Sequence, residues 1–581
     1  MPEISRRQQF LIRRGALQTE RSSYIGQYQE LSKLITPRTG RFLVTDRNKG
    51  GKRHNNIIDN AGSNGLRVLG AGLMAGMTSP ARPWFRLGLA DRSLMEYGPV
   101  KIWLAAVTDI MRTVFTKSNT YRALHMLYEE LGAYGTGASI VMDDFEDVIR
   151  HYPATCGEYM IATDHRGEVC TLYREFDMTV AAIVAEFGID AVSPSVRNMF
   201  KSGNNLDAWV TVMHIIEPNR DRDVKNPFSK NLPWTSIYME LAGQPAGQLN
   251  ENQFLREKGF KRFPALCPRW HTAGGDIYGD SPGMEALGDV KQLQHGQLRK
   301  TQGIDYRVKP PIQVPTSMKN QPLATLPGGV SYYDQTTPHG GIRSAFDVNL
   351  SLTEQLEDIR DVRQRIRGTF YVDLFLMLAQ NDSPDASRQP ITAREVAERH
   401  EEKLLMLGPV LERLHNELLK PKIDLTFDRM IEARIVPPPP QELNGHELQV
   451  EFISMLAQAQ RAIGVQGVDR LVQTVGTIAT FQRNSGMAPT ALDKLDVDEI
   501  VDQYADMLGV DPNLVIANDQ VAVIRKQRAE VQAQAAKQQQ MEAAANTAKT
   551  LAQAPTNEQN ALTDAVGAFS GYSGPGQANA V

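Results

Sequence analysis

The stretch from Thr392 to Leu419 constrains the fold more than any other, because it predicts one long amphipathic helix. Thr392 is followed three residues later by Glu395, the spacing of a capping box in which a hydroxyl and a carboxylate each satisfy a free backbone N–H. Apolar residues then recur at helical spacing, at Leu404, Leu407, Leu411, Leu414 and Leu418. Pro409 removes a backbone donor in the middle of this pattern, so we expect a kink beside Gly408.

Upstream of this helix, the sequence predicts two more helices, separated by an insert that cannot be helical. The first runs from Pro282, a residue that a first helical turn tolerates, to about Tyr306. The second runs from Leu350 to Leu378. The insert contains KPPIQVP, LPGG and HGG, which favour irregular structure or short strands. A polar loop at 380–390 then leads to Thr392.

The chain up to residue 281 mixes strand-like and helical patterns. Period-two patterning between turn residues predicts strands at 138–142, 159–162, 169–173, 209–216 and 234–241. We expect helices at 8–35, 94–133 and 178–187, and a glycine-rich helix within 55–84 whose small residues would let other helices approach closely. There is no regular βαβ rhythm, so the predicted fold class is α+β, mainly helical, rather than a doubly wound nucleotide-binding sheet.

The C-terminal part is predicted to be helical and then polar. Four prolines, Pro437 to Pro440, indicate a stiff spacer. Residues 445–525 have helical periodicity, with turns expected near Gly464, Gly486 and Gly509. Residues 529–554 are dominated by Ala, Gln and Glu and can form a helix, whereas the chain from 555 onward is expected to have no fixed fold.

The composition indicates a globular chain of several structural units. At about 150 residues per domain, 581 residues correspond to roughly four units. Hydrophobic residues make up 41% of the chain, yet no run reaches the roughly 18 apolar residues of a membrane span, and no apolar run follows the N-terminal arginines as in a secretory signal. Three separated cysteines predict neither a disulfide framework nor a zinc knuckle, and favour a reducing compartment.

Charge is distributed unevenly along the chain. Residues 1–53 contain twelve Lys or Arg and four Asp or Glu, a local charge of +8, although the whole chain carries −4. One interpretation is a solvated surface helix followed by a basic loop. The other is a surface that binds nucleic acid or an acidic partner, formed by Arg41, Arg47, Lys49, Lys52 and Arg53.

Signatures of enzymes are missing from the sequence. The phosphate-binding loop, the dinucleotide fingerprint, HExxH and GxSxG do not occur, and the eleven histidines show no metal-ligand spacing. Asp143 and Asp144 could be ligands of a metal ion, so a metal-dependent nuclease is an alternative. Adjacent residues of a strand point to opposite faces, however, so such a site would need further ligands from elsewhere in the chain. We therefore expect no catalytic activity, no cofactor and no metal.

Several segments together resemble the portal proteins of short-tailed bacteriophages, the connectors between head and tail. The most specific segment is 391–421, ITAREVAERHEEKLLMLGPVLERLHNELLKP. The others are GAGLMAGMTSPARPWFRL at 70–87, YGDSPGMEAL at 278–287, RVKPPIQVP at 307–315 and DEIVDQYADMLGVDP at 498–512. They follow the order of that family over about three quarters of the chain.

The resemblance implies a portal fold made of a wing, a stem, a clip and a crown. Its parts would be the wing at 1–281, the first stem helix at 282–306, the clip at 307–349, the second stem helix at 350–380, the tunnel loop at 381–390, the kinked wing helix and linker at 391–444, the helical crown at 445–528, and an Ala/Gln-rich helix with a tail at 529–581.

The resemblance also implies a function without covalent chemistry: a ring, a homododecamer in this family, at one capsid vertex. Double-stranded DNA would pass through its channel during packaging and ejection. Implied partners are other copies of the chain, that DNA, terminase, a tail adaptor, the major capsid protein, and scaffolding or internal core proteins, with no membrane. The expected place is the portal vertex of the virion, after assembly in the cytoplasm of the host bacterium. Another internal virion or scaffold protein is the remaining alternative.

Two further groups of residues are assigned by this resemblance. The loop in the DNA channel would consist of Asn381, Asp382, Ser383, Pro384, Asp385, Ala386, Ser387 and Arg388. The kinked helix would pack between subunits through its apolar stripe, with the residues Thr392, Glu395, Leu404, Leu407, Pro409, Leu411, Leu414 and Leu418.

Overall fold

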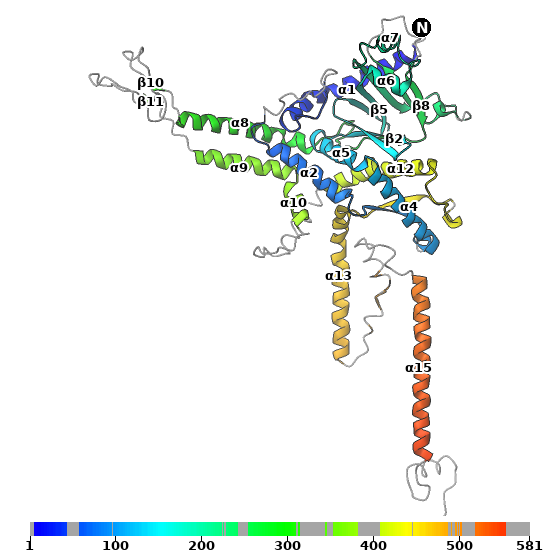
Figure 1. Cartoon of the computed structure of the whole chain (residues 1–581). Coiled ribbons are helices and arrows are strands. Elements are labelled where there is room, and N and C mark those ends of the chain that lie inside the picture. Colours follow the sequence, from blue (N-terminus) through cyan, green and yellow to red (C-terminus); the bar gives the residue numbers. More distant parts are fainter. Residues whose placement is uncertain are drawn as a thin grey trace, which may run out of the picture. The chain divides into compact units, whose positions relative to one another are not determined.

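The structure is a computed structural model of the chain (Figure 1). It describes residues 5–42, 57–95, 97–223, 225, 228–241, 254–308, 312–313, 343–344, 352–380, 407–443, 445–485, 490, 494–496, 498, 500–501 and 518–552. Two compact units can be separated, Met1–Val468 and Asp469–Val581.

The first unit mixes helices and strands throughout. Its helices before residue 300 are α1 (Arg6–Leu34), α2 (Ala61–Met77), α3 (Arg92–Met95), α4 (Gly98–Lys117), α5 (Thr120–Tyr134), α6 (Val180–Phe187), α7 (Pro194–Ser202) and α8 (Pro282–Val308). Its later helices include α9 (Leu352–Thr369), α10 (Val372–Gln380) and α12 (Lys420–Glu432). Short 3-10 turns occur at Ser229–Asn231 and Gln441–Leu443.

A five-stranded antiparallel sheet forms one layer of this unit. Its strands, in spatial order, are β4 (Tyr159–Thr163), β5 (Val169–Thr179), β6 (Trp209–Pro218), β7 (Trp234–Glu240) and β8 (Arg256–Phe260). Phe10 and Leu17 of α1 pack with Tyr173, Met213 and Ile237, whereas α6 and α7 pack with the alternate residues of the strands. Successive side chains of a strand point to opposite faces, so the sheet is covered on both sides.

Two smaller sheets connect distant parts of the chain. One has the order β3 (Val148–Ala154), β2 (Ala138–Asp144), β9 (Ala265–Leu266). In the other, β1 (Phe85–Leu89) pairs with β12 (Leu448–Phe452), so that Phe85 lies opposite Phe452. A strand at 448–452 contradicts the expectation that residues 445–525 are entirely helical, because the pairing with β1 supplies the hydrogen bonds that a helix would otherwise make internally.

Helices α5, α8, α9 and α10 all contact α2. A Cβ atom added at Gly62 would lie 3.0 Å from Val290 of α8, and one at Gly65 would lie 2.8 Å from Phe370. At Gly70 it would lie 2.9 Å from Glu129 of α5, and at Gly72 only 2.2 Å from Phe375 of α10. The close approach predicted for the glycine-rich helix is therefore confirmed.

Several predicted boundaries were wrong for local physical reasons. The helix expected at 94–133 is divided into α3, α4 and α5, because the backbone is extended at Tyr97, before α4, and at Ser118, after it. The helix expected at 350–378 breaks between α9 and α10, where Tyr371 has a φ of 54°. These breaks change the direction of the chain, so that each new helix can bury its own apolar face.

The remaining helices are α13 (Met455–Asn484) and α15 (Asn518–Ala552). The turn expected near Gly464 is absent, since α13 continues through this residue. The helix expected from the Ala/Gln-rich composition at 529–554 is confirmed by α15. Within the second unit, Arg525 donates to Asp498 at 2.6 Å. The described side chains of α15 are exposed except that of Val521, which is half-buried.

We predict opposite effects for two glycine substitutions within helices. Gly72→Ala should lower the free energy of unfolding by about 1–3 kcal/mol, because the new methyl group would overlap Phe375. Gly15→Ala in α1 should raise it by about 0.5–1 kcal/mol, because a Cβ there meets nothing within 4 Å. Urea unfolding of the two variants and the parent measures both changes. Equal changes in the free energy of unfolding for the two variants would show that the close contact at Gly72 does not affect stability.

Candidate functional site

The candidate site is the pair formed by α8 and α9, which lie side by side and extend away from the sheets (Figure 1). Helix α8 begins where Ser281 accepts a hydrogen bond from the backbone N–H of Met284 at 3.0 Å, and Pro282 occupies its first turn. Two short strands, β10 (Ile312–Gln313) and β11 (Arg343–Ser344), pair antiparallel beyond the helices. The predicted helix from Pro282 to about Tyr306 is confirmed.

A buried carboxylate attaches the pair to the rest of the unit. Asp59 precedes α2, and its side chain is 6% exposed. Its Oδ2 accepts hydrogen bonds from Arg363 of α9 at 2.7 and 3.0 Å and from Gln297 of α8 at 2.8 Å. Gln294 of α8 accepts from the backbone N–H of Asp59 at 2.9 Å and donates to its carbonyl at 2.7 Å. One residue therefore contacts both helices at the point where they leave the core.

The hydrogen bonds keep the Asp59 carboxylate ionised. Burial by itself would raise its pKa, but the hydrogen bonds from Arg363, Ala61 and Gln297 outweigh burial and lower the pKa below its usual value. A charge-assisted contact of this kind is stronger than a neutral hydrogen bond. This anchor was not predicted from the sequence, although Gln294 and Gln297 on the buried face of α8 were a visible signal.

The two helices are also joined along their length. Arg365 of α9 lies 3.2 Å from the carboxylate of Asp289 on α8, and Gln355 donates to the carbonyl of Gly296 at 3.4 Å. A Cβ atom at Gly296 would lie 3.7 Å from Ile359, so this glycine faces α9. These contacts at several positions fix the orientation of α8 relative to α9.

Beyond the anchor, the pair exposes apolar side chains. Leu298 of α8 is 43% exposed and Leu356 of α9 is 40% exposed. Leu298 follows Gly296 by two residues, about 200° around the helix, so it lies nearly opposite α9. Further exposed apolar residues of α8 are Ile304, Tyr306 and Val308. An exposed apolar surface on a projecting element indicates a site of association.

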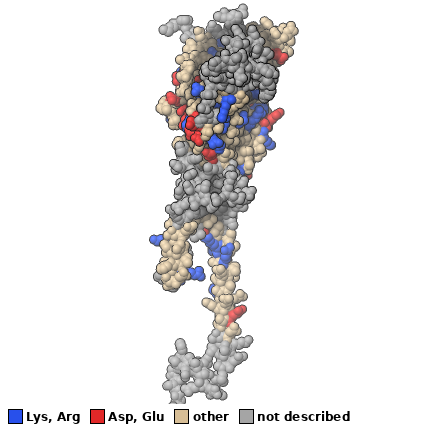
Figure 2. Space-filling model, turned by 90° about the vertical axis from the view of Figure 1, so that its left-hand side faces the viewer, with Lys and Arg blue, Asp and Glu red and all other residues tan. Residues whose placement is uncertain are grey.

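The charges of the pair do not create a field of one sign. Helix α8 carries four Lys or Arg and three Asp or Glu. Helix α9 carries four of each. On the face in Figure 2, both signs likewise lie among uncharged residues. The described residues of the pair therefore form no basic surface that would bind phosphates tightly.

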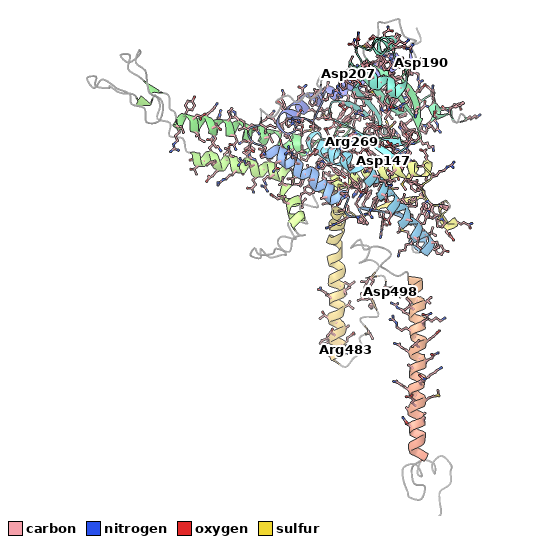
Figure 3. All side chains as sticks on the ribbon, viewed as in Figure 1. Asp147, Asp190, Asp207, Arg269, Arg483 and Asp498 are labelled. Carbon is pink, nitrogen blue, oxygen red and sulfur yellow. The ribbon has the colours of Figure 1, made fainter. Side chains whose placement is uncertain are left out.

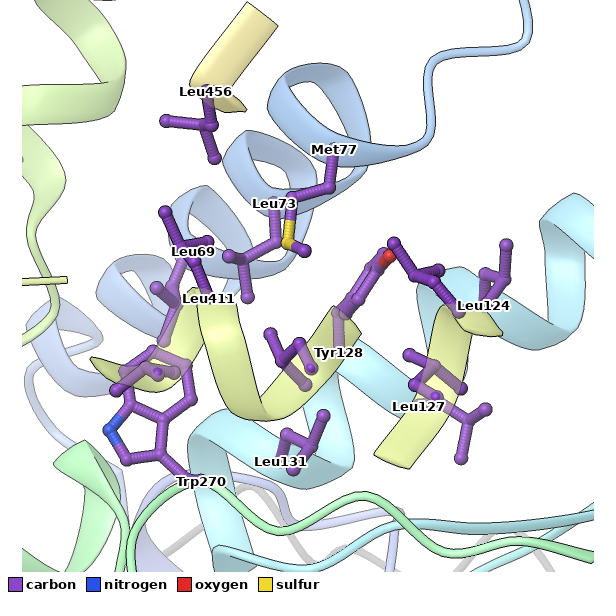
Figure 4. Close-up of a cluster of buried hydrophobic side chains, with 14 of the residues drawn as sticks. Leu69, Leu73, Met77, Leu124, Leu127, Tyr128, Leu131, Trp270, Leu411 and Leu456 are labelled. Carbon is purple, nitrogen blue, oxygen red and sulfur yellow. The ribbon is translucent and has the colours of Figure 1, made fainter. Parts of the chain in front are cut away.

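The apolar stripe of the predicted kinked helix is buried within the chain itself. Leu407, Leu411, Leu414 and Leu418 are all at most 1% exposed and belong to the largest core cluster. Figure 4 shows Leu411 among buried side chains of α2 and α5 and close to Trp270. Their burial therefore needs no second subunit. Thr392, Glu395 and Leu404 lie outside the described residues.

The helix does not end at Leu419 as expected. Residues 407–414 are helical, a π-helical turn follows at His415–Leu419, and α12 then continues to Glu432. Pro421, in the first turn of α12, cannot donate a backbone hydrogen bond, and the wider π turn accommodates it. Glu417 in this turn accepts from Arg269 at 2.6 Å, a residue labelled in Figure 3. The kink predicted at Pro409 stays a prediction.

The basic N-terminal segment has a different role in the part that is described. Arg41 forms ion pairs with Asp177 and Glu158. Arg14 of α1 lies 2.6 Å from Glu175, and Arg21 donates to the carbonyl of Tyr159 at 2.7 Å. These cations attach α1 and the segment that follows it to the five-stranded sheet and its edge, a role that neither interpretation of the sequence included. Arg47, Lys49, Lys52 and Arg53 lie outside the described residues, as do Asn381 to Arg388.

The described residues give no geometry for metal chemistry. They contain no group of three or more His, Cys, Asp or Glu side chains that could hold a metal ion. Asp144 instead accepts from the backbone N–H groups of Glu146 and Asp147 and so closes the β2–β3 turn. Among the helices so described, none is long and apolar enough to cross a membrane.

Comparisons with known proteins agree with the resemblance seen in the sequence. Residues 7–516 match the family described as "Bacteriophage head to tail connecting protein". The chain is 56% identical over 572 residues, 98% of its own length and 100% of the relative's, to "Probable portal protein" of Bordetella phage BPP-1. It is 45% identical over 559 residues, 96% of its length and 97% of the relative's, to "Portal protein" of Salmonella phage epsilon15.

Solved structures are more distant. A chain from "Neck of empty GTA particle computed with C6 symmetry" has a TM-score of 0.34 and 12% identity, covering 78% of this chain and 97% of that one. That similarity is too low to support a conclusion about the fold. The family match and the two nearly full-length relatives are sufficient by themselves: the chain belongs to the bacteriophage head to tail connecting protein family, whose relatives found here are named portal proteins.

Proposed function

We propose that the chain is the subunit of a portal ring, a homododecamer at one vertex of the capsid, through which double-stranded DNA is packaged and ejected. The observation that carries this proposal is the 56% identity to a probable portal protein over nearly the whole of both chains. The ring would also be the platform on which head and tail are joined, with terminase and later a tail adaptor bound to it. Capsid protein and scaffolding or internal core proteins would surround it in the virion.

The arrangement of the described elements supports the division into portal regions. Residues 1–281 would form the wing, and α8 and α9 would be the stem helices. The insert at 307–349, with β10 and β11 paired inside it, would form the clip. Residues 445–528 would form the crown, with the qualification that β12 already pairs with β1 of the wing.

We further propose that the exposed apolar residues of α8 and α9 form the contact between neighbouring subunits. The inner faces of both helices are already occupied by each other and by Asp59. Leu298 and Leu356 remain exposed on the pair. Closing a ring through a repeated heterologous contact would bury such residues in every copy.

The loop at 381–390 is proposed to enter the channel and act on DNA as a steric valve. It combines Asn, Asp, Ser and Pro, which favour turns, and its single basic residue Arg388 stands with Asp382 and Asp385. This composition fits sliding contact better than tight phosphate binding.

For the ring contact, we predict that the double variant Leu298→Glu, Leu356→Glu folds but no longer forms rings. Two carboxylates would have to be desolvated in an apolar contact, which is costly without partners. Negative-stain microscopy and mass photometry measure ring formation, and circular dichroism measures folding. Ser202→Glu on the exposed side of α7 is the control and should form rings like the parent. Normal rings from the double variant would exclude this surface. A parent protein that never forms rings would contradict the proposed function itself.

For the valve, we predict that deleting Ser383 to Ser387 leaves ring formation intact and impairs packaging or retention of the genome. The capping box at Thr392 and Glu395 is retained, so the next helix can still begin. The measurements are ring yield by microscopy and packaged DNA length by pulsed-field electrophoresis of mutant particles. Particles that package and hold full-length DNA would show that the loop is only a connection.

A further inference from the structure

Lys422 is a buried lysine whose Nζ has no hydrogen-bond partner among the described residues. It lies in the first turn of α12, and its side chain is 0% exposed. Its Nζ lies 4.4 Å from the centre of the Phe115 ring on α4. Burial lowers the pKa of Lys422 well below its usual value. A lysine in such a place is stable when it is uncharged.

A second buried base occupies the same region. His151 of β3 is 2% exposed, and its Nε2 has no partner. Its other ring nitrogen lies 3.4 Å from the hydroxyl of Ser139, and its backbone exchanges two hydrogen bonds with Asn119. Burial and then the charge of Lys422 lower the pKa of His151 well below its usual value. Because α12 packs against β3, the charge state of Lys422 influences the protonation of His151.

The elements around these bases offer no counter-ion. Helix α4 presents Phe115, β2 presents Ser139, and the α4–α5 connection presents Asn119, none of which is charged. Within α12, Thr426 donates to the carbonyl of Lys422 at 2.8 Å. No carboxylate in the described part of the chain contributes to either shift. A proton taken up by either base would therefore create an uncompensated buried charge.

We propose that Lys422 and His151 form a proton-sensitive latch, which holds α12 against β3 and α4 while both bases are uncharged and releases it when they are protonated. Helix α12 is continuous with the π turn and with residues 407–414. Release of α12 would therefore also loosen the buried leucines of that helix. The latch is independent of ring formation.

The direction of the pH effect follows from proton binding. Outside the docked state, lysine binds a proton below about pH 10.4 and histidine below about pH 6.5. While α12 is packed against β3 and α4, burial disfavours protonation of both bases. The state in which α12 is released therefore binds more protons and is favoured as pH falls. Each proton taken up on opening raises the opening equilibrium by up to about tenfold per pH unit.

Hydrogen–deuterium exchange of the full-length chain tests the latch. After correction for intrinsic exchange chemistry, peptides from α12 should lose protection as pH is lowered from 8 to 5, whereas peptides from α6, which contains no His or Lys, should not. Lys422→Met keeps the length of the side chain but cannot bind a proton, so it should protect α12 and flatten this pH dependence above about pH 6.5. Lys420→Met, at an exposed lysine two residues away, is the matched control and should behave like the parent.

Two outcomes would overturn the proposal. One is a parent protein in which the corrected exchange of α12 does not change with pH, a result that needs no variant. The other is equal behaviour of Lys422→Met and Lys420→Met. If Lys422→Met does not fold, His151→Phe provides the second test, and it should remove the loss of protection below pH 6.5.

Discussion

The close approach of helices to α2 is the constraint on which the helical body depends. Gly62, Gly65, Gly70 and Gly72 have no side chains where α8, Phe370, α5 and α10 reach this helix. Larger residues there would push the neighbouring axes apart, and the buried leucines of residues 407–418 would then lose their contacts in the shared core. The position of the α8–α9 pair therefore follows from backbone contact as much as from apolar burial.

Several charged residues of this fold join packed elements to one another instead of lying free on the surface. Arg14, Arg21 and Arg41 connect the N-terminal part to the five-stranded sheet through carboxylates and backbone carbonyls. Asp59 attaches α8 and α9 to the start of α2. Lys422 differs from these, because it is buried and its Nζ has no hydrogen-bond partner among the residues that the structure describes. The ion pairs of Arg14, Arg41 and Asp59 persist at all pH values where the acids are ionised, whereas burial favours the uncharged form of Lys422.

The functional surface and the structural core lie on different parts of the same elements. The base of α8 is buried with Val290 and Leu293, and its far end exposes Leu298 and Val308. A single helix therefore stabilises one chain through its base and, in the proposed ring, would contact another copy through its far end. This division explains why an apolar stripe in the sequence does not by itself identify a subunit interface, as the leucines at 407–418 demonstrate.

The sequence by itself determined the elements whose signals are local. The periodicity at 282–306, the alternation at 209–216 and the Ala/Gln-rich stretch predicted α8, β6 and α15, because short-range backbone preferences and side-chain patterns are sufficient for them. Only the tertiary structure decided which residues meet across long distances in the chain. Arg86 of β1 contacts Glu451 of β12 across 365 residues, and Asp59 meets Arg363 across 304. Whether a charge is solvated, paired or buried depends on what lies opposite it, and no local pattern contains that information.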